Sequence, residues 1–208
     1  MRTSQCMFWL TVSAAVLLAG TAAAQESRPR PNVAPSGRIT TSVTFDGRVL
    51  PGGRWFTGTP SHSGPSRITI DYGQPHARGR TIFGGLVPYD TVWRLGANWA
   101  TRLILDFDVR FGDLDVPRGE YTLFMVPREQ GAELIISAQT RHWGTEYDPA
   151  QDFGRTHIEH RPLAETRQSL AITLEPNRPD TEGEIPSGTL RISWGTDEYF
   201  TAWHMLWP

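Results

Sequence analysis

The stretch that decides the fold is residues 101–111, TRLILDFDVRF, in which apolar and polar side chains alternate along the chain. One set of alternate positions is entirely apolar and consists of Leu103, Leu105, Phe107, Val109 and Phe111. The other set is mostly charged, and only Ile104 interrupts it. A period of two is typical of a β-strand with one face in a core and the other in water. The sequence therefore predicts a strand here, with the five odd-numbered apolar side chains directed inward.

The same alternation recurs on both sides of this stretch. Residues 39–45 and 67–72 alternate in the same way, and 121–126 is apolar on both faces, which favours a central strand. Further strands are predicted at 132–138, 155–161, 168–174, 189–194 and 199–206, with a hairpin turn at 195–198. Apart from a short turn around 91–100, no window has helical periodicity, and 51–66 is rich in Gly and Pro. We expect an all-β fold, an antiparallel β-sandwich or jelly-roll-like domain with long Gly/Pro-rich loops and little helix.

The amino terminus has the pattern of an export signal. Arg2 precedes an apolar run, and Ala22-Ala23-Ala24 supplies small residues before Gln25. The predicted organisation is a signal peptide at 1–24, a flexible linker at 25–37 and a single β-sandwich domain at 38–208. We expect a periplasmic or secreted protein with no membrane span after signal cleavage. Cys6, the only cysteine, lies in the leader, so the mature chain is predicted to have neither disulfides nor thiolate chemistry.

Composition narrows the function classes. Of the 208 residues, 38% are hydrophobic and 20% are charged, which is typical of a globular protein. The net charge of −2 lacks the basic surplus of a nucleic-acid binder, so no nucleic-acid partner is expected. All 20 basic residues are arginine, which excludes lysine Schiff-base chemistry. No phosphate loop, nucleophile elbow or zinc-protease motif occurs, and we predict no cofactor.

Residues 157–160, His-Ile-Glu-His, place two imidazoles and a carboxylate within four residues, a combination that occurs in metal sites. On a strand His157 and His160 point to opposite faces, so they cannot chelate one ion together. The deaminase pattern that contains His-x-Glu also requires downstream cysteines, which are absent. No metal site is predicted.

Two segments concentrate polar and aromatic groups, 91–101 (TVWRLGANWAT) and 141–148 (RHWGTEYD). Arg94 and Asn98 offer fixed donors, and an arginine fork suits a carboxylate or phosphate. The indoles of Trp93, Trp99 and Trp143 lie in these non-alternating segments and suit a ligand platform, although core packing explains them as well. Bracing of loops by Arg94 and Asn98 is the structural alternative. Trp194, Trp203, Met205 and Trp207 alternate as core residues.

These segments belong to an ordered set of motifs. The set comprises YGQP at 72–75, GRTIFGGLVPY at 79–89, VWRLGAN at 92–98, VPRGEYTLF at 116–124, Pro127 and HWG at 142–144. Over about 67–175 the chain resembles the bacterial domain of unknown function 2911 family. The resemblance implies an exported, mostly β domain whose activity is not established. The family usually has Glu after Gly-Ala-Asn, where this chain has Trp99, so a catalytic acid at that position would be missing here.

Two functional hypotheses follow. The favoured one is a non-catalytic cell-envelope module that binds a small anionic or glycan ligand, with ligand-binding candidates Arg80, Trp93, Arg94, Asn98, Trp143 and Tyr147. The alternative is a hydrolase or isomerase in which His142 acts as general base and Glu146 or Asp148 orients it. We favour the first because the sequence shows neither a nucleophile nor a metal-binding set. Protein partners are not indicated.

Overall fold

The computed structural model describes residues 36–45, 48–50, 54–56, 66–178 and 185–206. All of them fall within one compact unit that spans Ala34–Pro208. The predicted signal peptide and most of the predicted linker and of the 51–66 loop lie outside the described residues, so those predictions stay predictions.

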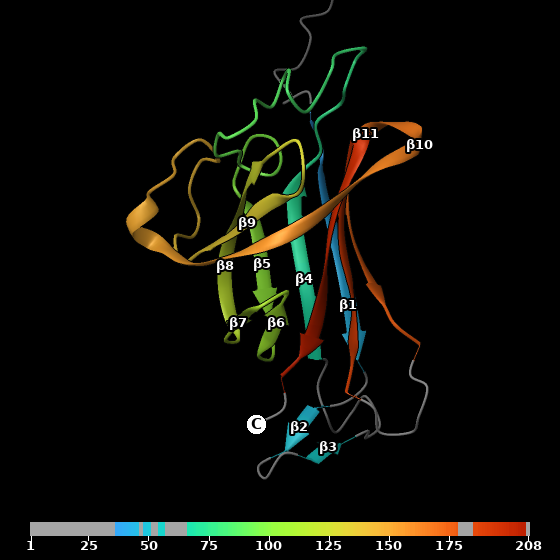
Figure 1. Cartoon of the computed structure of the whole chain (residues 1–208). Helices are drawn as coiled ribbons and strands as arrows, with labels where there is room; N and C mark the ends of the chain where they lie inside the picture. Colours follow the sequence, from blue (N-terminus) through green and yellow to red (C-terminus); the bar gives the residue numbers. More distant parts are fainter. Residues whose placement is uncertain (1–35, 46–47, 51–53, 57–65, 179–184, 207–208) are drawn as a thin grey trace, which may run out of the picture. The chain divides into compact units, whose positions relative to one another are not determined.

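Nine antiparallel strands form one continuous sheet, in the order β1-β4-β5-β8-β9-β10-β11-β6-β7 (Figure 1). Their bounds are β1 Arg38–Phe45, β4 Ser66–Gly73, β5 Thr101–Leu105, β6 Val109–Phe111, β7 Leu114–Val116, β8 Gly119–Pro127, β9 Ala132–Ser137, β10 Asp152–Pro176 and β11 Ser187–Met205. Two short strands, β2 Arg48–Leu50 and β3 Arg54–Phe56, pair separately. The only helix in the described part of the chain is a 3₁₀ turn, η1 Pro149–Gln151, so no described helix could cross a membrane. The all-β prediction is confirmed, with the main strands joined in a single sheet.

The deciding stretch 101–111 contributes two strands rather than one. β5 pairs with β4 and β8, whereas β6 pairs with β11 and β7. The chain leaves the first ladder at Asp106, whose side chain accepts a hydrogen bond from the Arg67 backbone N–H (3.1 Å). The alternation nevertheless continues across the break. All five odd-numbered apolar side chains are at most 7% exposed, so their inward direction is confirmed.

The carboxyl-terminal strands are longer than the sequence predicts. Segments 155–161 and 168–174 join in β10, and 189–194 and 199–206 join in β11. The predicted hairpin turn at Gly195–Glu198 is wrong, because these residues lie inside β11. Gly195 has φ +64°, and the β10–β11 register shifts on both sides of its partner Arg167. A β-bulge gives the same sequence signal as a turn, since both use glycine at positive φ.

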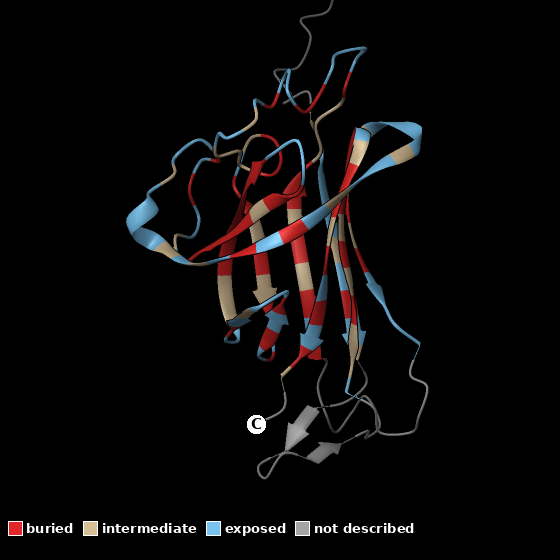
Figure 2. Cartoon of the chain, viewed as in Figure 1, coloured by how far each residue is buried: buried red, intermediate tan, exposed pale blue. Residues whose placement is uncertain are grey.

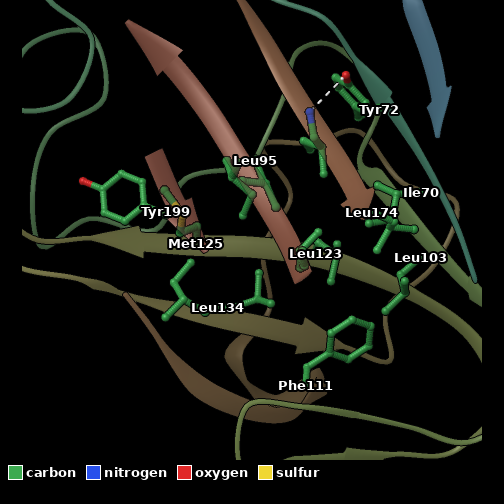
Figure 3. Packing of buried hydrophobic residues seen from close by; sticks show 14 of the residues in the cluster. Ile70, Tyr72, Leu95, Leu103, Phe111, Leu123, Met125, Leu134, Leu174 and Tyr199 are labelled. Carbon is green, nitrogen blue, oxygen red and sulfur yellow. Dashed lines mark hydrogen bonds between the residues drawn. The ribbon is translucent and has the colours of Figure 1, made fainter. Parts of the chain in front are cut away.

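The sheet curls so that β1 approaches the second half of β10. Thr41 Oγ1 donates to the Ile172 carbonyl (2.9 Å), and the Ile172 N–H donates to the Tyr72 hydroxyl (3.2 Å, Figure 3). The concave side encloses the main core, which includes Leu103, Leu123 and Leu134 (Figure 3). Figure 2 shows the resulting alternation of buried and exposed positions along the strands.

β8 is buried on both faces, as the sequence predicts for a central strand. Leu123 and Met125 face the main core, while Phe124 and Val126 form a second cluster with Ile135. Val92 and Tyr147 cover that second cluster from two loops. Trp194, Trp203 and Met205 are core residues, as expected, and Trp207 lies outside the described residues.

Candidate functional site

The site is built on the connection between β4 and β5. Trp93 exchanges two backbone hydrogen bonds with Met125 of β8 (2.7 and 2.9 Å). The Ala97 N–H donates to the Gly73 carbonyl (3.1 Å), and this approach requires a glycine, because a Cβ at position 73 would lie 1.9 Å from the Ala97 oxygen. The predicted short turn around 91–100 is therefore an irregular segment pinned to the sheet at several points.

Two residues of this segment have strained backbones. Leu95 has φ 48° and Asn98 has φ 64°. Positive φ is tolerated by asparagine but is an outlier for leucine. Leu95 is fully buried, and its carbonyl accepts a hydrogen bond from Thr101 Oγ1 (2.9 Å). Such conformations persist only where the surroundings over-determine them, and they cluster at functional sites.

The second polar–aromatic segment docks onto the first. The Gly144 N–H donates to the Asn98 carbonyl (3.0 Å), and the Ala100 N–H donates to the His142 carbonyl (3.2 Å). A Cβ at position 144 would lie 2.7 Å from Arg94 Cδ, so glycine lets the loop close against the arginine side chain. The structure thus brings the two predicted segments together.

Between them lies a cavity of about 500 Å³, here called the Arg94 cavity. Of the six predicted ligand-binding residues, five line it: Arg80, Trp93, Arg94, Asn98 and Tyr147. Trp143 does not, although its neighbour Gly144 does. The remaining lining is Ser36, Pro75, Leu86, Val87, Val92, Gly96, Ala97, Phe124, Thr145 and Trp194. The sequence does not predict Phe124 and Trp194 as lining residues. For Phe124 a signal exists, because both faces of β8 are apolar and the face opposite the main core must also be covered.

The charge of the Arg94 cavity is one-sided. Its lining contains two arginines and neither Asp nor Glu. Arg94 donates through Nε to the Gly96 carbonyl (3.3 Å) and makes no ion pair with any described residue. Burial lowers the pKa of the Arg94 guanidinium below its ordinary value. Among the described residues, Arg80 donates to two backbone carbonyls, those of Ala77 and His76 (both 2.9 Å).

The walls of the Arg94 cavity are aromatic and fixed. Trp93 stacks on Trp194 with ring centroids 5.8 Å apart, and Tyr147 packs edge-on against Phe124 at 4.8 Å. The Tyr147 hydroxyl donates to Asp152 (2.8 Å) and accepts from Arg155 (2.8 Å). Burial and the Asp152 hydrogen bond raise the pKa of Tyr147 to about 12, so its phenol is neutral at physiological pH.

The His142 ring contacts a backbone carbonyl and an aromatic ring, and neither candidate carboxylate is among its partners. It is 8% exposed, stacks on Phe124 at 5.9 Å, and its Nδ1 lies 2.9 Å from the Trp143 carbonyl. Because that partner is an acceptor, Nδ1 carries the proton. Glu146 is exposed, and Asp148 accepts from the Ala150 N–H at the start of η1 (3.0 Å). Neither is hydrogen-bonded to His142, which does not line the Arg94 cavity, so this geometry gives the acid–base alternative no support.

Trp99 and Trp143 lie outside the Arg94 cavity and are 54% and 41% exposed. Their rings meet edge to face at 5.7 Å. Trp99 lines a second cavity of about 450 Å³ with Arg38, Asp71, Ala100, Arg102 and Arg141, here called the Trp99 cavity. Asn98 and Trp99 are adjacent in sequence but line different cavities.

The two histidines of the 157–160 segment have different surroundings. His157 is exposed, and His160 Nε2 pairs with Asp197 (2.8 Å). Within the described residues, no group of three or more His, Cys, Asp or Glu side chains is arranged to hold a metal ion.

Comparison with known proteins gives one match. The sequence model of the family described as "Protein of unknown function (DUF2911)" matches residues 58–200, more than half of the chain and beyond both ends of the resemblance seen in the motifs. No curated protein and no solved structure matches significantly. The matched region contains both arginines of the Arg94 cavity and the loop that closes on Arg94. The chain belongs to the DUF2911 family of proteins of unknown function.

Proposed function

We propose that this protein is an exported, non-catalytic module of the cell envelope that binds a small anionic ligand in the Arg94 cavity. One observation carries the proposal: two arginines line a cavity of about 500 Å³ whose described lining has no carboxylate. That volume suits a small molecule, and ligand sites are typically apolar hollows with a few convergent polar groups.

Arg94 is the principal anchor. Its guanidinium is partly buried, and a cation removed from water without a counter-charge is unfavourable. A carboxylate or phosphate that accepts two parallel N–H bonds from the fork supplies the missing charge. Arg80 adds a second positive charge at the exposed side of the same cavity.

The aromatic walls select the rest of the ligand. Trp93 presents an indole that the buried Trp194 supports from behind, and Tyr147 presents a second ring that packs on the buried Phe124. Because the segment around Arg94 is pinned to β8 and to Gly73, little ordering is needed on binding. A planar or apolar body with one anionic group therefore fits best.

The test is calorimetric titration with benzoate and phenyl phosphate, and with benzamide as the uncharged analogue. We expect the two anions to bind and benzamide to bind at least ~10-fold more weakly. Arg94→Met should abolish anion binding, and Arg94→Lys should restore only part of it, because lysine keeps the charge but loses the fork. Arg118→Ala, an exposed arginine outside the cavity, is the matched control.

Two outcomes would contradict the proposal. One is that neither anion binds; the other is that both bind the Arg94→Met variant as tightly as the wild type.

Export of the protein is tested separately. The amino terminus of the protein recovered from the periplasm or the medium should begin at Gln25, and full-length protein in the cytoplasm would overturn that part.

A further inference from the structure

The Trp99 cavity carries features that the Arg94 cavity does not share, and no residue lines both. Trp99 is 54% exposed, an unusual exposure for an indole on a folded domain. The cavity lies at the ends of three neighbouring strands, since Arg38 begins β1, Asp71 is in β4 and Arg102 is in β5. Trp99 is in contact with the exposed Trp143 and lies beside charged side chains, and contiguous exposed aromatic surface rimmed by polar residues is typical of a binding site.

The Trp99 ring is held in place although it is exposed. The Trp99 backbone forms an isolated bridge with Trp143, and its carbonyl accepts from Arg38 Nη1 (3.4 Å). The Trp143 ring supports it edge to face at 5.7 Å. A fixed ring loses little conformational entropy when a ligand stacks on its free face.

The charges of the Trp99 cavity are mixed but favour an anion. Arg38 is paired with Asp71. Arg102 and Arg141 share Glu120, at 3.0 and 3.9 Å. These three arginines are thus balanced by two carboxylates, and Arg141 is the least engaged because its side chain is 80% exposed and its contact is the longest.

We infer that the Trp99 cavity is a second binding site and that it takes a glycan containing uronic acid. The indole face stacks on the apolar face of a pyranose ring. Asp71 and Arg102 offer an acceptor and donors to ring hydroxyls, and Arg141, whose side chain is exposed and whose pairing with Glu120 is long, pairs with the sugar carboxylate. This inference does not depend on the function proposed for the Arg94 cavity.

The experiment is a calorimetric titration of the full mature chain with tetragalacturonate, its fully methyl-esterified form and hexaglutamate. We expect tetragalacturonate to bind, with ~10-fold weaker binding by Trp99→Ala and an intermediate affinity for Trp99→Phe, which keeps a ring. The methyl ester should bind more weakly than the acid, and Arg141→Ala should remove that difference. Phe153→Ala, another exposed aromatic, and Arg118→Ala are matched controls that should leave the affinity unchanged.

Four results would overturn the inference. The first is no binding of tetragalacturonate, the second is equal binding to Trp99→Ala and the wild type, and the third is equal binding of the ester and the acid. The fourth is binding of hexaglutamate that matches tetragalacturonate with the same dependence on Trp99, which would indicate a surface for acidic peptides. Thermal unfolding of each variant accompanies the titrations, and Trp99→Phe separates loss of the ring from any loss of fold. Arg94→Met should leave tetragalacturonate binding intact, which separates the two sites.

Discussion

Two groups of arginines in this protein have the same chemistry and opposite surroundings. On the β10–β11 ladder, Arg161 and Arg191 both donate to Glu198 (2.7 and 3.0 Å), and both lie over the Phe200 ring (5.3 and 5.8 Å). In the Arg94 cavity, the hydrogen bonds of the two arginines within the described part of the chain all go to backbone carbonyls. The charges of the first group are neutralised by Glu198, whereas the charges of the second group have no carboxylate partner among the described residues. The difference separates arginines that stabilise the fold from arginines available to a ligand.

Removal of the central carboxylate should give the largest effect on stability. Glu198 is buried and also accepts from Ser193 Oγ (2.9 Å). Glu198→Gln keeps the shape but leaves Arg161 without its counter-charge and Arg191 with Glu175 as its remaining partner. We expect a loss of about 2 kcal/mol in the free energy of unfolding. Urea denaturation measures it. The contrast between the two groups of arginines is contradicted if this variant is as stable as the wild type. It is also contradicted if the variant loses anion binding in the Arg94 cavity.

The same carboxylate predicts a pH dependence. Burial alone would raise the pKa of Glu198, but hydrogen bonds from Ser193 and Arg161 and the charge of Arg191 hold it below its ordinary value of 4.5. A carboxylate with a lowered pKa in the folded state stabilises the fold above its unfolded pKa, and this stabilisation is lost as the pH falls through the folded value. The stability difference between wild type and Glu198→Gln should therefore be full at pH 7 and should narrow below pH 4.5. A difference that stays constant down to pH 3 would contradict this assignment.

The backbone of the site segment gives an intermediate effect. At Asn98 (φ 64°), alanine is disfavoured and glycine is not. Asn98→Ala should lower the free energy of unfolding by about 1 kcal/mol relative to Asn98→Gly. Both variants lose the side-chain hydrogen bond to the Ser36 carbonyl (3.3 Å), so their difference isolates the backbone term. Equal thermal stabilities would show that the segment relaxes and is not held at this conformation.

These positive φ values also explain what the sequence could and could not predict. Period-two alternation predicts the strands and their inward faces well, because each strand has one buried side, as Leu103 and Phe111 show. The sequence around Gly195 predicts a turn where the structure has a bulge, because glycine marks both and the pairing of β10 with β11 distinguishes them. Within 93–100 the chain follows neither a period of two nor one of 3.6, so no pattern could assign Asn98 to one cavity and Trp99 to the other.

The site residues themselves were found by composition more than by pattern. Arg94, Asn98 and Trp93 stood out because donors and an indole occur together in one short segment. Their contact with Gly144 is a long-range contact, and a single sequence holds no signal for it. Trp143 was grouped with them for its residue type, whereas its ring supports Trp99 instead.

The smallest expected effect on stability is the most informative about the Arg94 cavity. Arg94 has one long hydrogen bond to Gly96 (3.3 Å), no ion pair within the described part of the chain, and a guanidinium that is partly desolvated. Arg94→Met keeps the aliphatic stem that packs near Gly144 and removes the unpaired charge, so we expect the free energy of unfolding to change by less than about 0.5 kcal/mol. Arg191→Met is the matched comparison, and it should be clearly destabilising because it strips Glu198 and Glu175 of a partner. If Arg94→Met instead destabilised the protein as much as Arg191→Met, Arg94 would stabilise its loop. Its charge would then not be available to a ligand.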